Sequence, residues 1–377
     1  MVHTYKNNGY NIVLDANSGS IHVVDEVAYD VIDNYTSSDM RQMIKGKYPG
    51  IDDHDIDEIC SDVEELKKEG KLFSEDIFEP FAKDFNSRNS VLKALCLHVA
   101  HVCNMDCEYC FAGKGSYNGK SGLMSYDTGV KAIDFLIENS KDRKNLEVDF
   151  FGGEPLLNWE VVKELVRYGR SREQECGKNF RFTLTTNGLL IDDDVIDFTC
   201  REMSNVVISL DGRKEVNDRM RHLPGGGSSY DAIIGGFKKL AEARNQKNYY
   251  MRGTYTANNK DFVEDILHMA DLGFKQLSAE PVVAPSDASY ALKEGDVPYL
   301  CEQYEKLAIE MINRKKQGSG FTFYHYMIDL MLIRASHCIE QCGFSTILIT
   351  SKCKNHKFSL SSLTSILFAS ATLIVSS

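Results

Sequence analysis

Apolar and polar positions alternate near the start of the chain and predict a small module of mixed α and β structure. Residues 10–14 and 20–24 interleave apolar with polar side chains around a turn-rich stretch, which is typical of a β-hairpin. Helical periodicity follows over residues 26–35, 38–47 and 56–69, with Asp25 as an N-cap for the first. We therefore expect an α+β module over residues 1–85.

Beyond residue 90 the pattern changes to strands and helices in alternation. Apolar runs predict strands over residues 94–99, 146–151, 180–185, 206–210, 249–255 and 276–281. Helical patterns separate them over residues 126–139, 159–173, 193–202, 230–244 and 261–272, and residues 298–317 predict one more helix. Tandem β/α units predict a parallel sheet over residues 90–320, either open and doubly wound or part of a (β/α) barrel. Both forms bind ligands at the carboxyl ends of the strands.

The pattern degrades over the last part of the chain, residues 330–377. Residues 358–377 form an uncharged apolar run with many hydroxyl side chains and no helix caps. The run is long enough to span a membrane, but its Ser and Thr content weakens that signal. Two interpretations stay open, a poorly specified tail and a membrane anchor, and the composition favours the tail, so we expect no membrane partner.

Composition and charge narrow the class of protein. The chain of 377 residues is 43% hydrophobic and 26% charged, the balance of a globular protein. Its formal net charge of -12 argues against a nucleic-acid partner, because phosphate binding requires a surplus of Lys and Arg. Residues 1–10 are polar and contain no signal-peptide stretch, so we expect a cytoplasmic location. In that reducing compartment the 11 cysteines are expected to be thiols or metal ligands.

Three cysteines follow the first strand of the expected sheet. Cys103, Cys107 and Cys110 lie in one short loop, and chance alone rarely produces such a cluster. Zinc would need a fourth ligand, for which His98 and His101 are near in sequence. A 4Fe-4S cluster normally takes four cysteines, so three would leave one iron open to chelate a substrate or cofactor. We favour the cluster over zinc.

Small and polar residues end the next strands. Gly152 and Gly153 allow a ligand to approach the backbone, and Glu154, which precedes Pro155, offers an acceptor for an ammonium group. Taken alone, this motif could be an ordinary turn between strand and helix. Thr186 and Asn187 end the third strand, where small polar side chains could hold a ribose.

The fourth strand ends with Ser209 and Asp211, and Arg221 follows in a basic stretch. Asp211 has two interpretations, a ribose or substrate contact and a helix N-cap. Arg221 also has two, a contact to an anionic group of a ligand and a surface arginine. The residues alone leave both pairs of alternatives open.

Together these motifs resemble the radical SAM superfamily. The spacing Cys103-x3-Cys107-x-Tyr109-Cys110 and the Gly-Gly-Glu-Pro element carry the resemblance, which covers residues 92–329. It implies a partial (β/α)6 barrel and two cofactors, a 4Fe-4S cluster on the three cysteines and S-adenosyl-L-methionine (SAM). It also implies reductive SAM cleavage to a radical that abstracts a substrate hydrogen. The cofactor-binding residues implied are Tyr109, Gly152, Gly153, Glu154, Pro155, Thr186, Asn187, Ser209, Asp211 and Arg221, with Glu154 on the SAM ammonium and Arg221 on its carboxylate.

Within the superfamily, the layout resembles the peptide-modifying, SPASM-type branch, which includes anaerobic sulfatase maturases. The whole arrangement, including residues 209–221, looks most like the maturases of six-cysteine (SCIFF) peptides. These enzymes form thioether crosslinks during the maturation of ribosomally synthesised, post-translationally modified peptides (RiPPs). The amino-terminal module then resembles a winged-helix-like peptide-recognition element, in which a leader peptide adds a strand to a sheet edge. The partners implied are a ribosomally made cysteine-rich precursor peptide and a reductant such as ferredoxin or flavodoxin.

One departure from that branch affects the expected activity. SPASM-type enzymes continue into a cysteine-rich domain with auxiliary clusters, whereas the tail here offers Cys338, Cys342 and Cys353 in spacings that do not match. The loss of pattern after residue 330 suggests a truncated or frameshifted reading of a longer gene. Two hypotheses therefore stay open, an active peptide-modifying enzyme and a SAM- or peptide-binding remnant without turnover.

Overall fold

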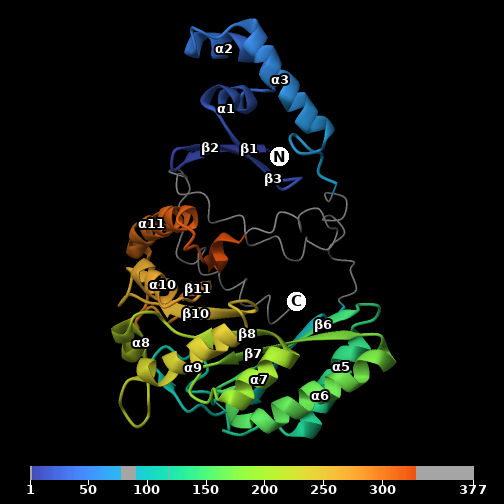
Figure 1. The fold of residues 1–377 in the computed structure, drawn as a ribbon, viewed down its shortest axis with the longest axis vertical. Helices are drawn as coiled ribbons and strands as arrows, with labels where there is room; N and C mark the ends of the chain where they lie inside the picture. The colour runs from blue at the N-terminus through green and yellow to red at the C-terminus, as the bar shows by residue number, and fades with distance from the viewer. Residues whose placement is uncertain (1, 78–90, 118, 328–377) are drawn as a thin grey trace. The chain divides into compact units, whose positions relative to one another are not determined.

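The computed structural model describes residues 2–77, 91–117 and 119–327 (Figure 1). These residues fall into two compact units, one within residues 1–89 and one within residues 90–327. The predicted tail, with its three cysteines and apolar run, lies outside the described residues. Among the described residues, no helix combines the length and the apolar character that crossing a membrane requires.

The first unit is a three-stranded antiparallel sheet followed by three helices. Its elements are β1 (Val2–Asn7), β2 (Tyr10–Asp15), β3 (Ser20–Val24), α1 (Glu26–Asp33), α2 (Met40–Lys47) and α3 (Asp53–Lys68). The predicted hairpin is confirmed as β2 and β3, and Asp25 caps α1 by accepting hydrogen bonds from the Val27 and Ala28 amides. The sequence prediction missed β1, whose few apolar residues gave no strand signal and which pairs along the whole of β2.

Two small apolar clusters hold this unit together. One contains Val13, Ile32, Val63 and Leu72 and joins β2 to helices α1 and α3. The strand order β1-β2-β3 leaves β3 at an edge of the sheet. On that edge strand the side chains of Ile21 and Val23 are exposed, the latter by 63%.

The second unit is built on a seven-stranded parallel sheet. Its strands are β4 (Ala94–Ala100), β6 (Asn145–Gly152), β7 (Asn179–Thr186), β8 (Met203–Ser209), β10 (Tyr249–Tyr255), β11 (Gln276–Pro281) and β12 (Thr322–Phe323). Neighbouring strands follow one another in chain order, from β4 at one edge to β12 at the other. In a doubly wound sheet the order of the strands would reverse near the middle. The continuous order seen here indicates an open, partial barrel instead. All six predicted strands are confirmed, and β12 is an addition.

The helices between these strands match the predicted helices closely, except that α8 was not predicted. They are α5 (Tyr126–Asn139), α6 (Trp159–Cys176), α7 (Asp193–Glu202), α8 (Lys214–Met220), α9 (Ser229–Ala243), α10 (Phe262–Asp271) and α11 (Val297–Lys316), with short 3-10 turns η2 (Pro155–Asn158), η3 (Glu294–Asp296) and η4 (Tyr324–Tyr326). Figure 1 shows α5, α6, α7 and α9 together along one face of the sheet. Buried side chains such as Phe150, Phe182 and Leu184 fill the core between the sheet and the helices. None of these four helices lies on the opposite face of the sheet.

Candidate functional site

The predicted motifs all lie at one edge of the parallel sheet. The cysteine loop follows β4, Gly152 ends β6, Thr186 ends β7 and Ser209 ends β8. These four strands are direct neighbours in the order β4-β6-β7-β8. Because they are parallel, their carboxyl ends meet at the same edge, so the fold gathers motifs that are more than 100 residues apart in the chain.

The cysteine loop is held by a short pairing that the sequence did not predict. Two residues of the loop form β5 (Asp106–Cys107), which pairs with β9 (Arg221–His222) in an antiparallel ladder. The Glu108 amide also donates a hydrogen bond of 2.8 Å to the Met220 carbonyl. The segment after α8 therefore fixes the loop that carries the three thiols.

The three cysteines are close together and only partly exposed. The thiol of Cys107 is near enough to Cys103 and Cys110 for their charges to interact. Burial raises the pKa of Cys107 to about 12, while the nearby Arg221 guanidinium lowers it. Burial also raises the pKa of Cys103. The raised pKa values keep the thiols of Cys103 and Cys107 protonated in the free protein, and binding a cationic metal centre would release their protons.

The spacing of the thiols does not fit a zinc ion. With Zn–S bonds of about 2.3 Å, the sulfur atoms around one zinc lie about 3.8 Å apart. Within the described residues, no group that includes a cysteine brings three possible ligand atoms within 4.8 Å of one another. His98 and His101 pack against Tyr117 instead, with ring centroids 4.6 and 5.2 Å from its ring. This arrangement leaves room for a cluster that offers a separate iron to each thiolate.

Glycines bring the end of β6 against the cysteine loop. Gly152 has a φ of 134°, and a Cβ there would lie 2.4 Å from the Ala100 carbonyl oxygen. A Cβ on Gly153 would lie 2.1 Å from the carbonyl oxygen of Val102, the residue before Cys103. Both contacts are with backbone atoms, which cannot rotate away. The two glycines are therefore required for this approach.

Replacing Gly153 with alanine should displace the cysteine loop. We expect overpacking to lower the free energy of unfolding by roughly 1–3 kcal/mol and to reduce the iron retained after anaerobic reconstitution. Gly122→Ala is the matched control, because a Cβ at Gly122 meets no atom within 4 Å and its φ is not positive. Iron content and thermal unfolding of the two variants check this expectation. Equal iron content in both would contradict it.

Glu154 is completely buried and ties two motifs together. Its carboxylate accepts hydrogen bonds from the Thr186 hydroxyl at 2.8 Å and from the Asn187 and Leu156 amides at 2.8 and 3.0 Å. Burial raises the pKa of Glu154 to about 7, and these hydrogen bonds act to lower it. A carboxylate can accept about four hydrogen bonds, so one position remains for a ligand. Pro155, directly after it, begins the η2 turn.

Asn187 connects the end of β7 to the cysteine loop. Its side-chain amide donates hydrogen bonds to the Asn104 side chain at 2.8 Å and to the Cys103 sulfur at 3.6 Å. Sequence reasoning missed Asn104, which lies between two motif residues and carries no signal of its own. Ser209 lies at the end of β8 and is partly buried.

Asp211, Arg221 and Tyr109 form a buried cluster beside the cysteine loop. The Asp211 carboxylate accepts hydrogen bonds from the Tyr109 hydroxyl at 2.7 Å, the Arg221 guanidinium at 3.0 Å and the Thr254 amide at 2.9 Å. Arg213 holds the N-cap position of α8, so Asp211 does not cap that helix. Arg221 is 8% exposed, which excludes the surface interpretation, and its Nε is buried without a hydrogen-bond partner among the described residues. That N–H remains available to a ligand.

A family comparison covers this part of the chain. The sequence model of the radical SAM superfamily matches residues 97–271, which include the cysteine loop and the ends of β6, β7 and β8. Proteins of this superfamily use a 4Fe-4S cluster and SAM.

Curated relatives match over parts of their length. The chain is 24% identical over 268 residues to the radical SAM cyclopropyl synthase TigE of Paramaledivibacter caminithermalis, covering 65% of this chain and 55% of that protein. It is 30% identical over 172 residues to the serine-type anaerobic sulfatase-maturating enzyme of Bacteroides thetaiotaomicron, covering 43% and 38%. The chain spans about half, or less, of the length of the curated relatives it matches.

The fold is also similar to that of a solved structure. Native anSMEcpe with bound AdoMet and the Kp18Cys peptide aligns with a TM-score of 0.55 and 21% identity, over 63% of this chain and 64% of that one. This likeness supports the partial barrel fold of the second unit. Over residues 97–271, the sequence of this chain is similar to that of the radical SAM superfamily.

Proposed function

We propose that this chain is a peptide-modifying radical SAM enzyme. Cys103, Cys107 and Cys110 would hold a 4Fe-4S cluster that cleaves SAM reductively. The substrate would be a ribosomally made, cysteine-rich precursor peptide, and the product a thioether crosslink. A reductant such as ferredoxin or flavodoxin would supply the electron.

One observation carries the proposal. Three thiols, spaced too widely for a single metal ion, lie beside a buried carboxylate and a buried guanidinium at the carboxyl edge of a partial barrel. Glu154 keeps an acceptor position for an ammonium, and Arg221 keeps a free Nε–H for a carboxylate. An α-amino acid carries both groups, so the methionine part of SAM matches this pair.

The bound cluster and SAM would supply the radical that removes a hydrogen atom from the substrate. The chain's own residues orient the cofactor and exclude water, and no protein base is required for hydrogen abstraction. For a thioether, the peptide loses one hydrogen atom from the α-carbon and one proton from the thiol as the C–S bond forms. The remaining electron would pass to a one-electron acceptor. An oxidised iron–sulfur cluster is an acceptor of this kind.

The first unit supports a peptide substrate. Its edge strand β3 exposes Ile21 and Val23, and one side of this strand pairs with no other strand among the described residues. Such an edge can accept an added strand, with main-chain hydrogen bonds giving affinity and alternate side chains giving specificity. The peptide in the anSMEcpe structure is a further precedent for peptide binding on a similar barrel.

Replacing Ile21 and Val23 with aspartate should weaken peptide binding about tenfold, because apolar contact area is lost and charge is placed against the added strand. The probe is a fluorescently labelled six-cysteine precursor peptide, titrated into the full chain and followed by anisotropy. Met43→Asp is the matched control, since Met43 on α2 is 50% exposed and lies away from the strand edge. Equal losses in both variants, or none in either, would count against strand addition.

The proposed reaction is tested with the anaerobically reconstituted full chain, SAM, dithionite and the same peptide. We expect 5′-deoxyadenosine and a peptide that has lost two hydrogen masses per crosslink.

A second candidate, sulfatase-maturase-like modification, is favoured by the likeness to the Bacteroides enzyme. Turnover of a sulfatase-derived peptide in place of the six-cysteine peptide would support that candidate. No 5′-deoxyadenosine from a fully loaded protein would support a binding remnant.

A further inference from the structure

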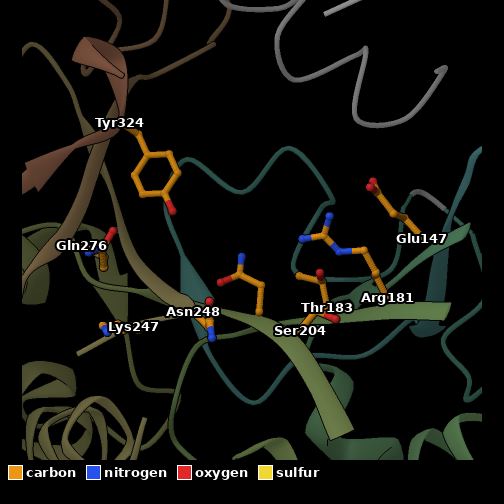
Figure 2. Close-up of a pocket in the computed structure, with 9 residues that line it drawn as sticks. Glu147, Arg181, Thr183, Ser204, Lys247, Asn248, Gln276 and Tyr324 are labelled. Carbon is orange, nitrogen blue, oxygen red and sulfur yellow. The ribbon is translucent and has the colours of Figure 1, made fainter. Parts of the chain in front are cut away.

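The face of the sheet that lies opposite helices α5, α6, α7 and α9 carries several polar side chains. On β6 the buried positions are Leu146, Val148 and Phe150, so Glu147 and Asp149 point to the other face. The same alternation operates on β7 and β10. A pocket of about 450 Å3 lies near the amino-terminal ends of these strands. Figure 2 shows polar side chains that project into it from several strands. Its lining residues are Glu147, Arg181, Thr183, Ser204, Asn205, Lys247, Asn248, Gln276 and Tyr324.

Asp149 lies deeper on this face, midway along β6. It pairs in register with Cys96 on β4 and Thr183 on β7. Its Oδ1 is buried and has no hydrogen-bond partner among the described residues. Burial raises the pKa of Asp149 to about 7, against the smaller opposing effects of the Thr185 hydroxyl and the Arg252 charge. A buried acceptor without a donor is unfavourable, which makes Asp149 a candidate ligand contact.

Arg252 lies on the same face, on strand β10. It pairs in register with Ser209 on β8 and Ser278 on β11, and its side chain is only partly exposed. Within the described part of the chain, its guanidinium forms no hydrogen bond and no direct ion pair. Its charge does interact with that of Asp149 and acts to lower the pKa of Asp149. The carboxylate of Asp149 and the guanidinium of Arg252 therefore lie on the same face of the sheet without forming an ion pair with each other.

Glu280, the other carboxylate near Arg252, already has partners. Its Oε1 lies 3.1 Å from the His325 Nε2 and accepts a hydrogen bond of 2.9 Å from the Ser278 hydroxyl. Burial acts to raise the pKa of Glu280, but the contact with His325, the Arg252 charge and the Ser278 hydroxyl together lower it to about 2. The Tyr304 hydroxyl, 3.0 Å from the His325 Nδ1, holds the imidazole in place. The charges of Glu280 and Arg252 interact, but among the described residues the two side chains form no direct ion pair.

We propose that Asp149 and Arg252 together hold one backbone amide of the peptide substrate. The Asp149 carboxylate would accept a hydrogen bond from the amide N–H, and the Arg252 guanidinium would donate one to the carbonyl oxygen. A peptide unit carries one donor and one acceptor and no net charge, so it satisfies both groups at once. A free carboxylate ligand would be repelled by Asp149, and an ammonium by Arg252. This inference rests on the peptide substrate of the proposed function.

The position of the pair suits a substrate held beneath the cofactor. Asp149 precedes Gly152, the last residue of β6, by three positions. A strand rises about 3.3 Å per residue, so Asp149 lies about 10 Å along the strand from the cofactor edge of the sheet. A peptide anchored there could extend a neighbouring α-carbon toward that edge.

The test uses the reconstituted full chain and the labelled six-cysteine peptide, with Asp149→Asn, Arg252→Gln and the double variant. We expect each single change to weaken peptide binding about tenfold and the double change to weaken it by less than the product, because both residues hold one amide. Glu147→Gln is the matched control, since Glu147 lies on the same strand and face two residues away. Cluster absorbance and thermal unfolding confirm that each variant is folded.

A scan of peptides methylated at single backbone nitrogens separates recognition from a structural effect. In the unaltered protein one position should lose affinity strongly, and that loss should disappear in Asp149→Asn. Uniform losses at every position in both proteins, or unchanged affinity in both single variants, would overturn the inference. Those results would leave SAM cleavage and crosslinking by the unaltered protein intact, so they are distinguishable from failure of the proposed function.

Discussion

Replacing Cys107 with alanine should abolish the cluster and with it SAM cleavage. The three cysteines are the only thiols in the loop, and each is expected to bind a separate iron. Changes to the outer-shell partners of a metal typically lower its affinity about 10- to 100-fold. Loss of a direct ligand should lower the affinity for the cluster by more than that. We expect iron to fall from roughly four per chain to a small fraction of that value. Iron analysis, visible absorbance and 5′-deoxyadenosine formation measure the effect.

Cys301→Ala is the matched control for this variant. Cys301 is exposed on α11, outside the cofactor site, and its loss should leave iron content unchanged. Full iron content and SAM cleavage in Cys107→Ala would show that the cluster is held elsewhere. Zinc bound in place of iron in the unaltered protein, without visible absorbance, would contradict the cluster assignment itself.

Glu154→Gln should weaken SAM binding by about 10- to 100-fold while the cluster remains. The carboxylate would form a charge-assisted hydrogen bond with the SAM ammonium, worth about 1.5–3 kcal/mol. The substitution removes this charge and also puts an amide NH2 against donors, because the Thr186 hydroxyl and the Asn187 amide both point at Glu154 oxygens. Both effects lower affinity. Equilibrium dialysis with labelled SAM under anaerobic conditions gives the dissociation constant.

Glu138→Gln provides the comparison for Glu154. Glu138 is exposed on α5, and removing its charge changes the net charge of the chain by the same amount. SAM affinity should be unchanged in that variant. The assignment of Glu154 to the ammonium would be wrong if both variants bound SAM as tightly as the unaltered protein, with clusters of equal content.

Local sequence determined most of the elements of this protein. Helix α7, for example, begins directly after the N-cap Asp192 and ends at Glu202. The residues that set these bounds lie within or next to the helix itself. The six predicted strands follow from runs of apolar residues, and their alternation with helices was enough to predict a parallel sheet. The cysteine loop and the Gly-Gly-Glu-Pro element were found in the same way, because their residues are adjacent in the chain.

Tertiary contacts decided what local patterns could not. Strands β5 and β9 contain two residues each and exist only because they pair with each other across more than 100 residues. The choice of a partial barrel over a doubly wound sheet depends on the order of strands, which no single segment encodes.

The same distinction applies to the site. The sequence indicated Glu154, Asp211 and Arg221, but their partners come from other strands, and burial sets the protonation of Glu154. Asp149 and Arg252 were missed, although a charged residue inside an apolar strand is a signal that could have identified them. Periodicity records which face a side chain occupies. Whether that side chain finds a partner depends on distant strands, and only the folded chain brings those strands together.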